Sequence, residues 1–319
     1  MKVLIIKLGA LGDVINSTSI IKQIMKHHTN DTVCLLTTPQ FSELFSHFNN
    51  LRVFAFERKG TINKIKTIRW IRENKFDRLY DLQSNDRTGF FSALSGIPYR
   101  AGNHPRYPYN KHPSTSYKGE CHSFERLNQI IESAGIPPAQ ALPYLPVPGK
   151  VTNNIASWLE KHGLEKDKFV LLHAGSSPKH LNKRWPHFEE LALHLAKLFN
   201  VVWLGGKDDI ALNKRLSESV GINSTNAFNI LDLVALGKSA RFAITNDSAP
   251  MHILSCSEIP VFGLFGPTYP RRTHALGQLE NVISANKVMA RNDNDFKPAN
   301  IADISIDMVL DKLKSHQLI

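Results

Sequence analysis

Asp13 is the first residue of this 319-residue sequence whose type and position suggest chemistry. It ends the turn Gly9-Ala10-Leu11-Gly12, which follows the apolar run Val3–Leu8 and precedes apolar residues at helical spacing. A carboxylate placed there can act as a general base toward a ligand in the crevice beyond the strand. It can equally cap the helix and complement its dipole, and the local sequence leaves both roles open.

A second group of polar residues follows the apolar run Phe169–His173. Ser176 and Ser177 stand in a short glycine-containing loop, and Lys183 and Arg184 follow before Trp185-Pro186. Hydroxyl groups, loop amides and a lysine are the donors that bind a diphosphate in many proteins. This segment therefore predicts an anion site.

A third group joins a strand to a helix in the segment Asn246-Asp247-Ser248-Ala249-Pro250-Met251-His252. The amides and dipole at the start of that helix favour an anion, and His252 in the first turn is expected to face it. An ordinary capped helix with Pro250 near its start and a core histidine explains the same spacing. Both interpretations stay open at this point.

Three other motifs argue against common cofactors. Gly9-x-x-Gly12 lacks the third glycine and the acidic second-strand end of a dinucleotide site, and Gly237-Lys238-Ser239 has Asp232 where a P-loop has glycine. Asp293-x-Asp295 has the spacing of a metal-binding carboxylate pair, but no apolar strand precedes it. We therefore expect no resident cofactor and no required metal.

Short apolar strands alternate with helices along the chain, which predicts an α/β fold with doubly wound parallel sheets. The expected strands are Val3–Leu8, Val33–Thr37, Arg52–Phe56, Leu79–Gln83, Phe169–His173, Val201–Leu204, Phe242–Thr245 and Pro260–Phe265. The expected helices are Val14–Met25, Phe41–Phe48, Ile62–Ile71, Thr88–Leu94, Phe188–Phe199, Ile210–Val220, Ile230–Leu236 and Ala249–Ser255.

The segment from Ser133 to Lys150 contains five prolines and no periodicity, as expected of a linker. We therefore predict two domains, residues 1–150 and 151–319, each long enough to bury its own core. The same segment includes the longest stretch without Asp, Glu, Lys or Arg, and its prolines exclude a transmembrane helix.

The charge and cysteine content narrow the choice of partner and compartment. The 39 Lys and Arg outnumber the 28 Asp and Glu, so the net charge is +11, which favours an anionic substrate, nucleic acid or an acidic membrane surface. Three widely spaced cysteines and an N-terminus too short for a signal peptide predict a cytoplasmic protein.

Taken together, these segments resemble the lipopolysaccharide heptosyltransferases, the inverting glycosyltransferases of family 9. The resemblance rests on Lys7-Leu8-Gly9-Ala10-Leu11-Gly12-Asp13-Val14, Asp81-Leu82-Gln83, His173-Ala174-Gly175-Ser176-Ser177, Lys183-Arg184-Trp185-Pro186, Asn246-Asp247-Ser248-Ala249-Pro250-Met251-His252 and Phe265-Gly266-Pro267-Thr268. It implies a GT-B fold, with two Rossmann-like domains facing a cleft. It also implies an N-terminal acceptor-binding domain and a C-terminal domain that binds the nucleotide-sugar donor, usually without a metal.

The resemblance also implies roles for individual residues. Asp13 is expected to deprotonate the acceptor hydroxyl, and Lys183 to neutralise the departing diphosphate. The expected donor-binding residues are Gly12, Ser176, Ser177, Lys183, Asp208, Asp247, Ser248, Ala249 and His252. Two features depart from the family pattern: Asp247-Ser248-Ala249 replaces Asp-Thr-Gly, and Asp208 stands in for an acid that binds the nucleotide ribose in some relatives.

The basic segment Tyr99–Lys118 is the candidate acceptor site, through Arg100, His104, Arg106 and Lys111, although a solvated loop has the same composition. Our interpretation is transfer of heptose from ADP-heptose to a Kdo or heptose of the lipopolysaccharide inner core. The enzyme would bind the cytoplasmic face of the inner membrane peripherally and would not bind nucleic acid. The alternatives are another nucleotide-sugar donor, or a non-catalytic polyanion-binding protein, which explains the charge but not the clustering of these residues at strand ends.

We expect EDTA to leave sugar transfer unchanged, because no convincing carboxylate pair adjoins the predicted diphosphate site. The measurement is the transfer rate with and without the chelator. Activity lost in EDTA and restored by a divalent metal would contradict this prediction and point to Asp293 and Asp295.

Overall fold

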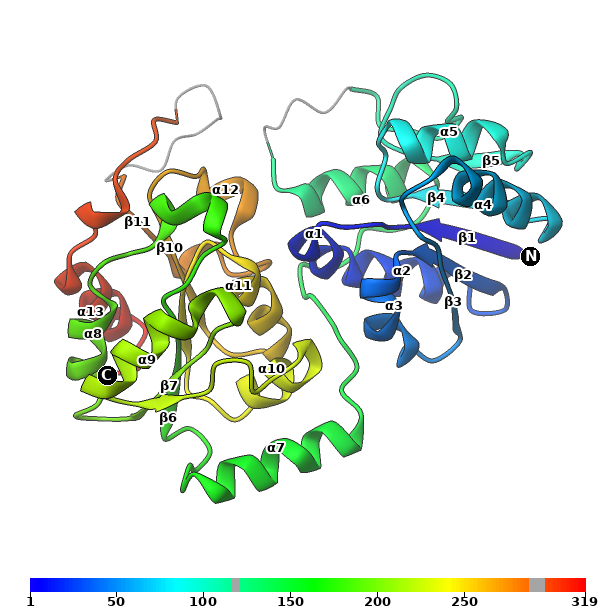
Figure 1. Cartoon of the computed structure of the whole chain (residues 1–319). Helices are drawn as coiled ribbons and strands as arrows, with labels where there is room; N and C mark the ends of the chain where they lie inside the picture. Colours follow the sequence, from blue (N-terminus) through cyan, green and yellow to red (C-terminus); the bar gives the residue numbers. More distant parts are fainter. Residues whose placement is uncertain (116–120, 287–295) are drawn as a thin grey trace. The chain divides into compact units, whose positions relative to one another are not determined.

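The computed structural model describes residues 1–115, 121–286 and 296–319 and divides into two compact units, Met1–Pro146 and Val147–Ile319 (Figure 1). The division falls inside the proline-rich segment. The expected boundary after residue 150 lies slightly later, inside the first helix of the second unit, α7 (Gly149–Lys161).

The first unit is a five-stranded parallel sheet in the order β3-β2-β1-β4-β5. Its strands are β1 (Lys2–Ile6), β2 (Thr32–Thr37), β3 (Leu51–Ala55), β4 (Arg78–Asp81) and β5 (Tyr99–Ala101). Its helices are α1 (Leu11–Asn16), α2 (Thr18–His27), α3 (Pro39–Ser46), α4 (Thr61–Glu73), α5 (Asp86–Leu94) and α6 (Ser123–Ser133). In Figure 1, α4 and α5 lie on one side of this sheet and α2 and α3 on the other.

The core of the first unit forms around β1, which pairs with β2 on one side and β4 on the other. Leu4 and Ile6 are fully buried and pack with Leu36, Leu79 and Phe91. A central parallel strand is covered on both faces, and this explains why Val3–Ile6 is continuously apolar rather than alternating.

The second unit is a six-stranded parallel sheet in the order β11-β10-β9-β6-β7-β8. Its strands are β6 (Phe169–His173), β7 (Asn200–Trp203), β8 (Ile222–Asn223), β9 (Ala243–Asn246), β10 (Val261–Phe265) and β11 (Val282–Ser284). Its α-helices, after α7, are α8 (Phe188–Leu195), α9 (Ile210–Ser219), α10 (Ile230–Gly237), α11 (Ala249–Leu254), α12 (Pro270–Thr273) and α13 (Ile306–Ser315).

Two hydrophobic cores cover the two faces of this second sheet. One is formed by side chains of α8, α9 and α13, including Phe188, Leu216 and Leu313. The other is formed by α7, α10 and α11, including Leu159 and Met251. The predicted doubly wound α/β class is therefore confirmed, with helices on both faces of each sheet.

The expected elements are confirmed to within a few residues, with one exception. The helix expected over Val14–Met25 is two helices, α1 and α2, separated at Ser17. The expectation omitted β5, β8 and β11, which are only two or three residues long, and the helices α6, α7, α12 and α13. Among the described residues, no helix combines the length and apolar character needed to cross a bilayer.

Gly266 lies in a tightly packed part of the second unit. A Cβ at this position would lie 2.5 Å from the backbone nitrogen of Ile301, so Gly266→Ala should lower the free energy of unfolding by about 1–3 kcal/mol. Urea unfolding followed by circular dichroism measures this change.

Gly149→Ala is the matched control, because nothing lies within 4 Å of its Cβ position at the start of α7. Alanine in a helix is at least as favourable as glycine, so this variant should be as stable as the wild type or slightly more stable. Equal stability of the two variants would show that the chain near Gly266 relaxes without cost.

Candidate active site

The turn after β1 brings Asp13 to the start of α1. Gly9 begins that turn with a φ of +130°, and a Cβ there would also lie 3.0 Å from the Phe41 ring. Glycine is therefore required by both the backbone conformation and the available space. Asp13 is exposed in the first turn of α1, with its carboxylate accessible to a bound molecule.

Lys7 is a buried lysine that interacts electrostatically with Asp13. Its side chain is 5% exposed, and its ammonium group donates a hydrogen bond to the Leu82 carbonyl at 3.2 Å. Burial lowers the pKa of Lys7, whereas the charges of Asp13 and Asp81 act to raise it. The sequence motif contained Lys7 and Asp81, but only the pairing of β1 with β4 shows that they act on each other.

Asp81 is a fully buried carboxyl at the end of β4. It accepts hydrogen bonds from the Ser84 amide at 2.7 Å, the Gln83 amide at 3.0 Å and the Tyr109 hydroxyl. Burial raises the pKa of Asp81, and these hydrogen bonds oppose the rise. A Cβ at Gly102 would overlap the Tyr109 ring, so this glycine makes room for the ring that reaches Asp81.

Arg58 is a cation near the Asp13 turn that sequence reasoning missed. Its guanidinium lies 3.8 Å from the Cβ position of Gly9. It follows the end of β3, and strand ends meet at one edge of a parallel sheet, which is the signal that could have identified it.

The basic segment after β5 is only partly available to a ligand. The Arg100 guanidinium is half-buried and donates to the main-chain carbonyls of Pro108 and Ile97, so it holds the shape of its own loop. His104, Arg106 and Lys111 are exposed, and the Lys111 ammonium lies 5.6 Å from the centre of the Tyr99 ring. Lys118, the last cation of the segment, lies outside the described residues.

Asn246 connects the two polar loops of the second unit. Its side-chain nitrogen donates to the carbonyls of Ala174 and Gly175 at 2.9 and 3.0 Å, and its oxygen accepts from the Trp185 amide at 3.1 Å. The side chain is fully buried, so these bonds replace all contact with water. The loop after β6 and the loop after β9 are thereby held as one structure.

Lys183 and Asp247, both expected donor-binding residues, form an ion pair in this structure. The Lys183 ammonium lies 2.6 Å from the Asp247 carboxylate, which also accepts a hydrogen bond from the Thr268 hydroxyl at 2.7 Å. The Lys183 side chain is 19% exposed, against 7% for Asp247. The lysine is therefore held in place from one side while part of its surface remains open to solvent.

The two serines of the loop after β6 differ in environment. Ser176 is buried, and its hydroxyl donates to the His180 carbonyl at 2.9 Å, while its own carbonyl accepts from Arg184 at 3.2 Å. Ser177 is exposed. In this structure Ser176 holds the loop, and Ser177 presents the more accessible hydroxyl.

His173 lies between a carboxylate and a hydroxyl at the end of β6. Its Nε2 is 3.6 Å from Asp209, and its Nδ1 is 3.2 Å from the Ser248 hydroxyl. Burial acts to raise the pKa of Asp209, but hydrogen bonding with His173 and the Gly206 amide outweighs burial and leaves the pKa lowered. The series Asp209, His173, Ser248 fixes the Ser248 hydroxyl at the start of α11.

The acid expected to bind ribose was Asp208, which is exposed. Its neighbour Asp209 is the buried member of the pair, and Arg184 approaches it at 3.4 Å. A Cβ at Gly175 would overlap Asp209, so the glycine of the first loop makes space for this carboxylate. Sequence reasoning missed Asp209, although its position next to Asp208 after a strand was a usable signal.

The remaining expected residues lie where the motifs placed them in the sequence. Ala249 is the first residue of α11, Ser248 precedes it, and His252 lies within α11 and is 8% exposed. Gly12 is half-buried in the first turn of α1, in the first unit. No structural feature assigns a ligand to these four residues, and their donor-binding roles remain predictions.

No three His, Cys, Asp or Glu side chains gather as a metal-binding group within residues 1–115, 121–286 and 296–319. Asp293 and Asp295, the carboxylate pair considered in the sequence, lie outside these ranges.

Comparison with known proteins identifies the family. The family model of glycosyltransferase family 9 (heptosyltransferase) matches residues 65–299, which is most of the chain. This chain belongs to glycosyltransferase family 9. It is therefore a glycosyltransferase, and the family resemblance seen in the motifs is confirmed.

Individual proteins match over nearly the whole length. Lipooligosaccharide heptosyltransferase 2 of Haemophilus influenzae (strain ATCC 51907 / DSM 11121 / KW20 / Rd) is 22% identical, with 98% of each chain covered. The crystal structure of the family 9 glycosyl transferase from Veillonella parvula DSM 2008 superposes with a TM-score of 0.82 at 21% identity, covering 98% of this chain and 96% of that one. E. coli ADP-heptose lps heptosyltransferase II gives 0.77 at 20% identity, covering 99% and 98%. The fold is thus that of the GT-B glycosyltransferases, as expected.

Lys183→Ala in this family 9 enzyme should lower turnover about 100-fold while changing donor affinity much less. Charge on the diphosphate grows as the glycosidic bond breaks, so the ammonium group stabilises the transition state more than the bound donor. Steady-state kinetics and calorimetric donor titration separate the two effects.

Lys179→Ala is the matched control, because Lys179 is an exposed lysine on the same 3-10 helix, Pro178–Lys183. It should behave as the wild type. A Lys183→Ala variant that lost only donor affinity would exclude the leaving-group role.

Proposed function

We propose that this enzyme transfers heptose from ADP-heptose to a Kdo or heptose residue of the lipopolysaccharide inner core, with inversion at the anomeric carbon. Family membership and the heptosyltransferases among its relatives support this substrate pair. The E. coli structure that shares the fold carries ADP-heptose in its name, and that donor is the one we propose here.

The observation that carries the proposal is the partly exposed Lys183 ammonium, fixed by Asp247 beside the loops that Asn246 joins. A cation that follows Ser177 in the same loop and is paired with Asp247, two residues before α11, suits a diphosphate. In this proposal Ser176, Ser177, Asp247, Ser248, Ala249, His252 and Gly12 bind or support the donor. Asp208 is the proposed contact to the nucleotide ribose.

The proposed reaction is a direct displacement. The Asp13 carboxylate accepts the proton of the acceptor hydroxyl, and the resulting oxygen nucleophile attacks the anomeric carbon of the donor sugar. The bond from that carbon to the diphosphate oxygen breaks, and ADP leaves with the bonding electron pair. Lys183 stabilises the negative charge that develops on the diphosphate, so no metal is needed for this step.

We propose that the first unit binds the acceptor. His104, Arg106 and Lys111 are exposed cations suited to acidic sugars and lipid phosphates, and Arg58 adds a cation near Asp13. Arg100 contributes by holding the loop that carries them. We further propose that the enzyme works at the cytoplasmic face of the inner membrane, on an acidic lipid surface, and does not act on nucleic acid.

Another nucleotide-sugar donor is the alternative to ADP-heptose, because the pair Ser248-Ala249 differs from the Thr-Gly common in the family. Calorimetric titration with a panel of nucleoside diphosphates tests the nucleotide. Binding of ADP well ahead of UDP, GDP and CDP supports the proposal, and preference for another base overturns it.

Asp13→Asn should reduce transfer by roughly 100-fold or more, the usual contribution of a general base, while donor binding stays within a few-fold of the wild type. Asp86→Asn is the matched control, since Asp86 is an exposed aspartate in the first turn of α5. It should retain full activity. Unchanged transfer in Asp13→Asn would remove Asp13 from the mechanism.

A further inference from the structure

Helix α4 exposes apolar side chains that no described element of its own unit covers. Ile62 is 69% exposed and Ile65 is 60% exposed, whereas Thr67 and Ile71 on the opposite side of the helix are buried. Ile62, Ile65 and Ile68 are spaced three residues apart, so they form one apolar stripe along the helix. Ile68 packs partly against the core, and the stripe becomes more exposed toward the N-terminal end.

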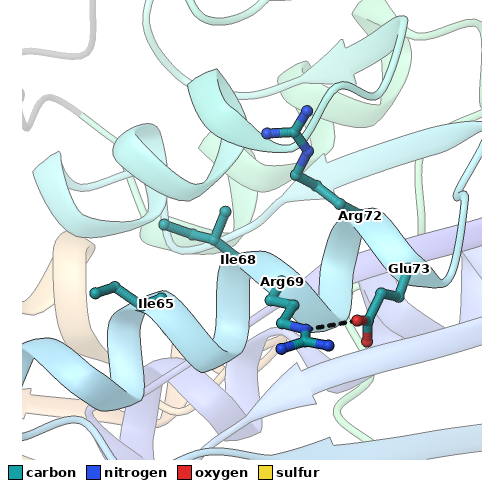
Figure 2. A pocket seen from close by; sticks show the side chains of 5 residues that line it. All are labelled: Ile65, Ile68, Arg69, Arg72 and Glu73. Carbon is teal, nitrogen blue, oxygen red and sulfur yellow. Dashed lines mark hydrogen bonds and ion pairs between the residues drawn. The ribbon is translucent and has the colours of Figure 1, made fainter.

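Figure 2 shows the side chains of α4 that line a groove at this stripe. A groove of about 450 Å³ is lined by Ile65, Ile68, Arg69, Arg72 and Glu73. The Arg69 side chain donates to Glu73 at 2.6 Å, and both side chains are mostly exposed. Apolar side chains and guanidinium groups therefore stand next to each other on one solvent-facing surface. We call Ile62, Ile65, Ile68, Arg69 and Arg72 the α4 face.

The segment that contains α4 is strongly basic. Residues 57–75 contain seven Lys and Arg but only two Glu, which gives a net charge of +5 in 19 of 319 residues. The whole chain carries +11. Close to half of the net charge therefore belongs to one segment, which favours an anionic partner.

The neighbouring helix adds apolar and aromatic groups on the same side of the sheet. The crossovers from β3 to β4 and from β4 to β5 run in the same direction, so α4 and α5 cover one face, and the two helices are in contact (Figure 1). Phe90 and Leu94 of α5 are 51% and 42% exposed. Tyr107 is 71% exposed and donates its hydroxyl to the Ala93 carbonyl at 3.2 Å.

We propose that the α4 face docks the enzyme on an anionic lipid bilayer, with Ile62 and Ile65 inserted among the lipids and the surrounding cations at the headgroups. A basic helix that presents isoleucines to solvent matches the interface of a membrane in both polarity and charge. Nucleic acid or an acidic protein would also pair with the cations, but nucleic acid gives the isoleucines no apolar environment. The proposal rests on the proposed function in one respect, because a lipid-anchored acceptor gives docking its purpose.

The test is sedimentation of the full chain with vesicles of equal parts phosphatidylglycerol and phosphatidylcholine, compared with pure phosphatidylcholine. We expect binding to the anionic vesicles only, weakened by added salt. The double variant Ile62→Ser/Ile65→Ser should bind about tenfold more weakly or worse, because two apolar side chains no longer enter the bilayer. No binding of the wild-type chain to anionic vesicles would overturn the proposal.

Matched control variants separate docking through α4 from non-specific binding of the protein to vesicles. Leu193→Ser/Leu198→Ser removes two exposed leucines of the second unit, 48% and 60% exposed, and should bind vesicles as the wild type does. Lys64→Glu/Lys66→Glu should lose binding, whereas Lys161→Glu/Lys166→Glu, with the same charge change in the second unit, should lose much less. Two results would reject membrane insertion at α4. One is an equal loss of vesicle binding in the α4 variants and in their controls. The other is a loss of binding in Lys64→Glu/Lys66→Glu while Ile62→Ser/Ile65→Ser binds as the wild type does.

A second readout keeps docking distinct from catalysis. Transfer from donor to a lipid-free core oligosaccharide in solution should be unchanged in Ile62→Ser/Ile65→Ser, whose circular dichroism spectrum confirms the fold. Wild-type transfer without vesicle binding would overturn the docking proposal alone. Vesicle binding without transfer would leave docking standing and overturn the proposed function.

Discussion

The buried amide of Asn246 is the interaction on which the candidate donor site depends. It satisfies two carbonyls and one amide of the connection between β6 and α8, at positions 61 to 72 residues away in the chain. Loss of such a side chain leaves several buried polar groups without partners, at about 1–3 kcal/mol each. The geometry of Lys183, Ser177 and the start of α11 therefore depends on a residue that need not touch the substrate.

The two units use buried charge in different ways. In the first, Lys7 and Asp81 are buried at the carboxyl ends of β1 and β4. Burial lowers the pKa of the lysine and raises the pKa of the carboxyl. Lys7 also interacts electrostatically with the exposed Asp13. In the second, Asp247 and Asp209 face cations directly, and Lys183 remains partly open to solvent. In the second unit, the buried Asp247 thus holds a partly accessible lysine.

Glycines decide how closely these partners approach. Gly175 leaves room for Asp209, and Gly102 leaves room for the Tyr109 ring that reaches Asp81. A methyl group at either position would overlap its neighbour. The close approach of Asp209 and of the Tyr109 ring therefore depends on the absence of a side chain at these glycines. Gly266 has the same role against the backbone of Ile301. Gly175 and Gly266, which belong to the family motifs, are therefore explained by packing rather than by a positive φ.

The α/β class and most strands and helices were predicted from the sequence, because apolar periodicity reports which face of each element is buried. β6 was predicted with the bounds that the structure shows, and the positions of the Asp13 turn and the Lys183 loop followed from the same pattern. Strands β8 and β11 were missed because two or three residues carry no period, and α7 because its proline-flanked start was assigned to the linker.

Only the tertiary structure showed which polar groups contact one another. Lys7 and Leu82 are 75 residues apart, and Lys183 and Asp247 are 64 apart, so their contacts depend on strand order and register rather than on local sequence. The different burial of Asp208 and Asp209 also became visible only in the structure, where Asp208 is exposed and Asp209 is buried. Local periodicity determines the elements, whereas the pairing of distant strands determines the site.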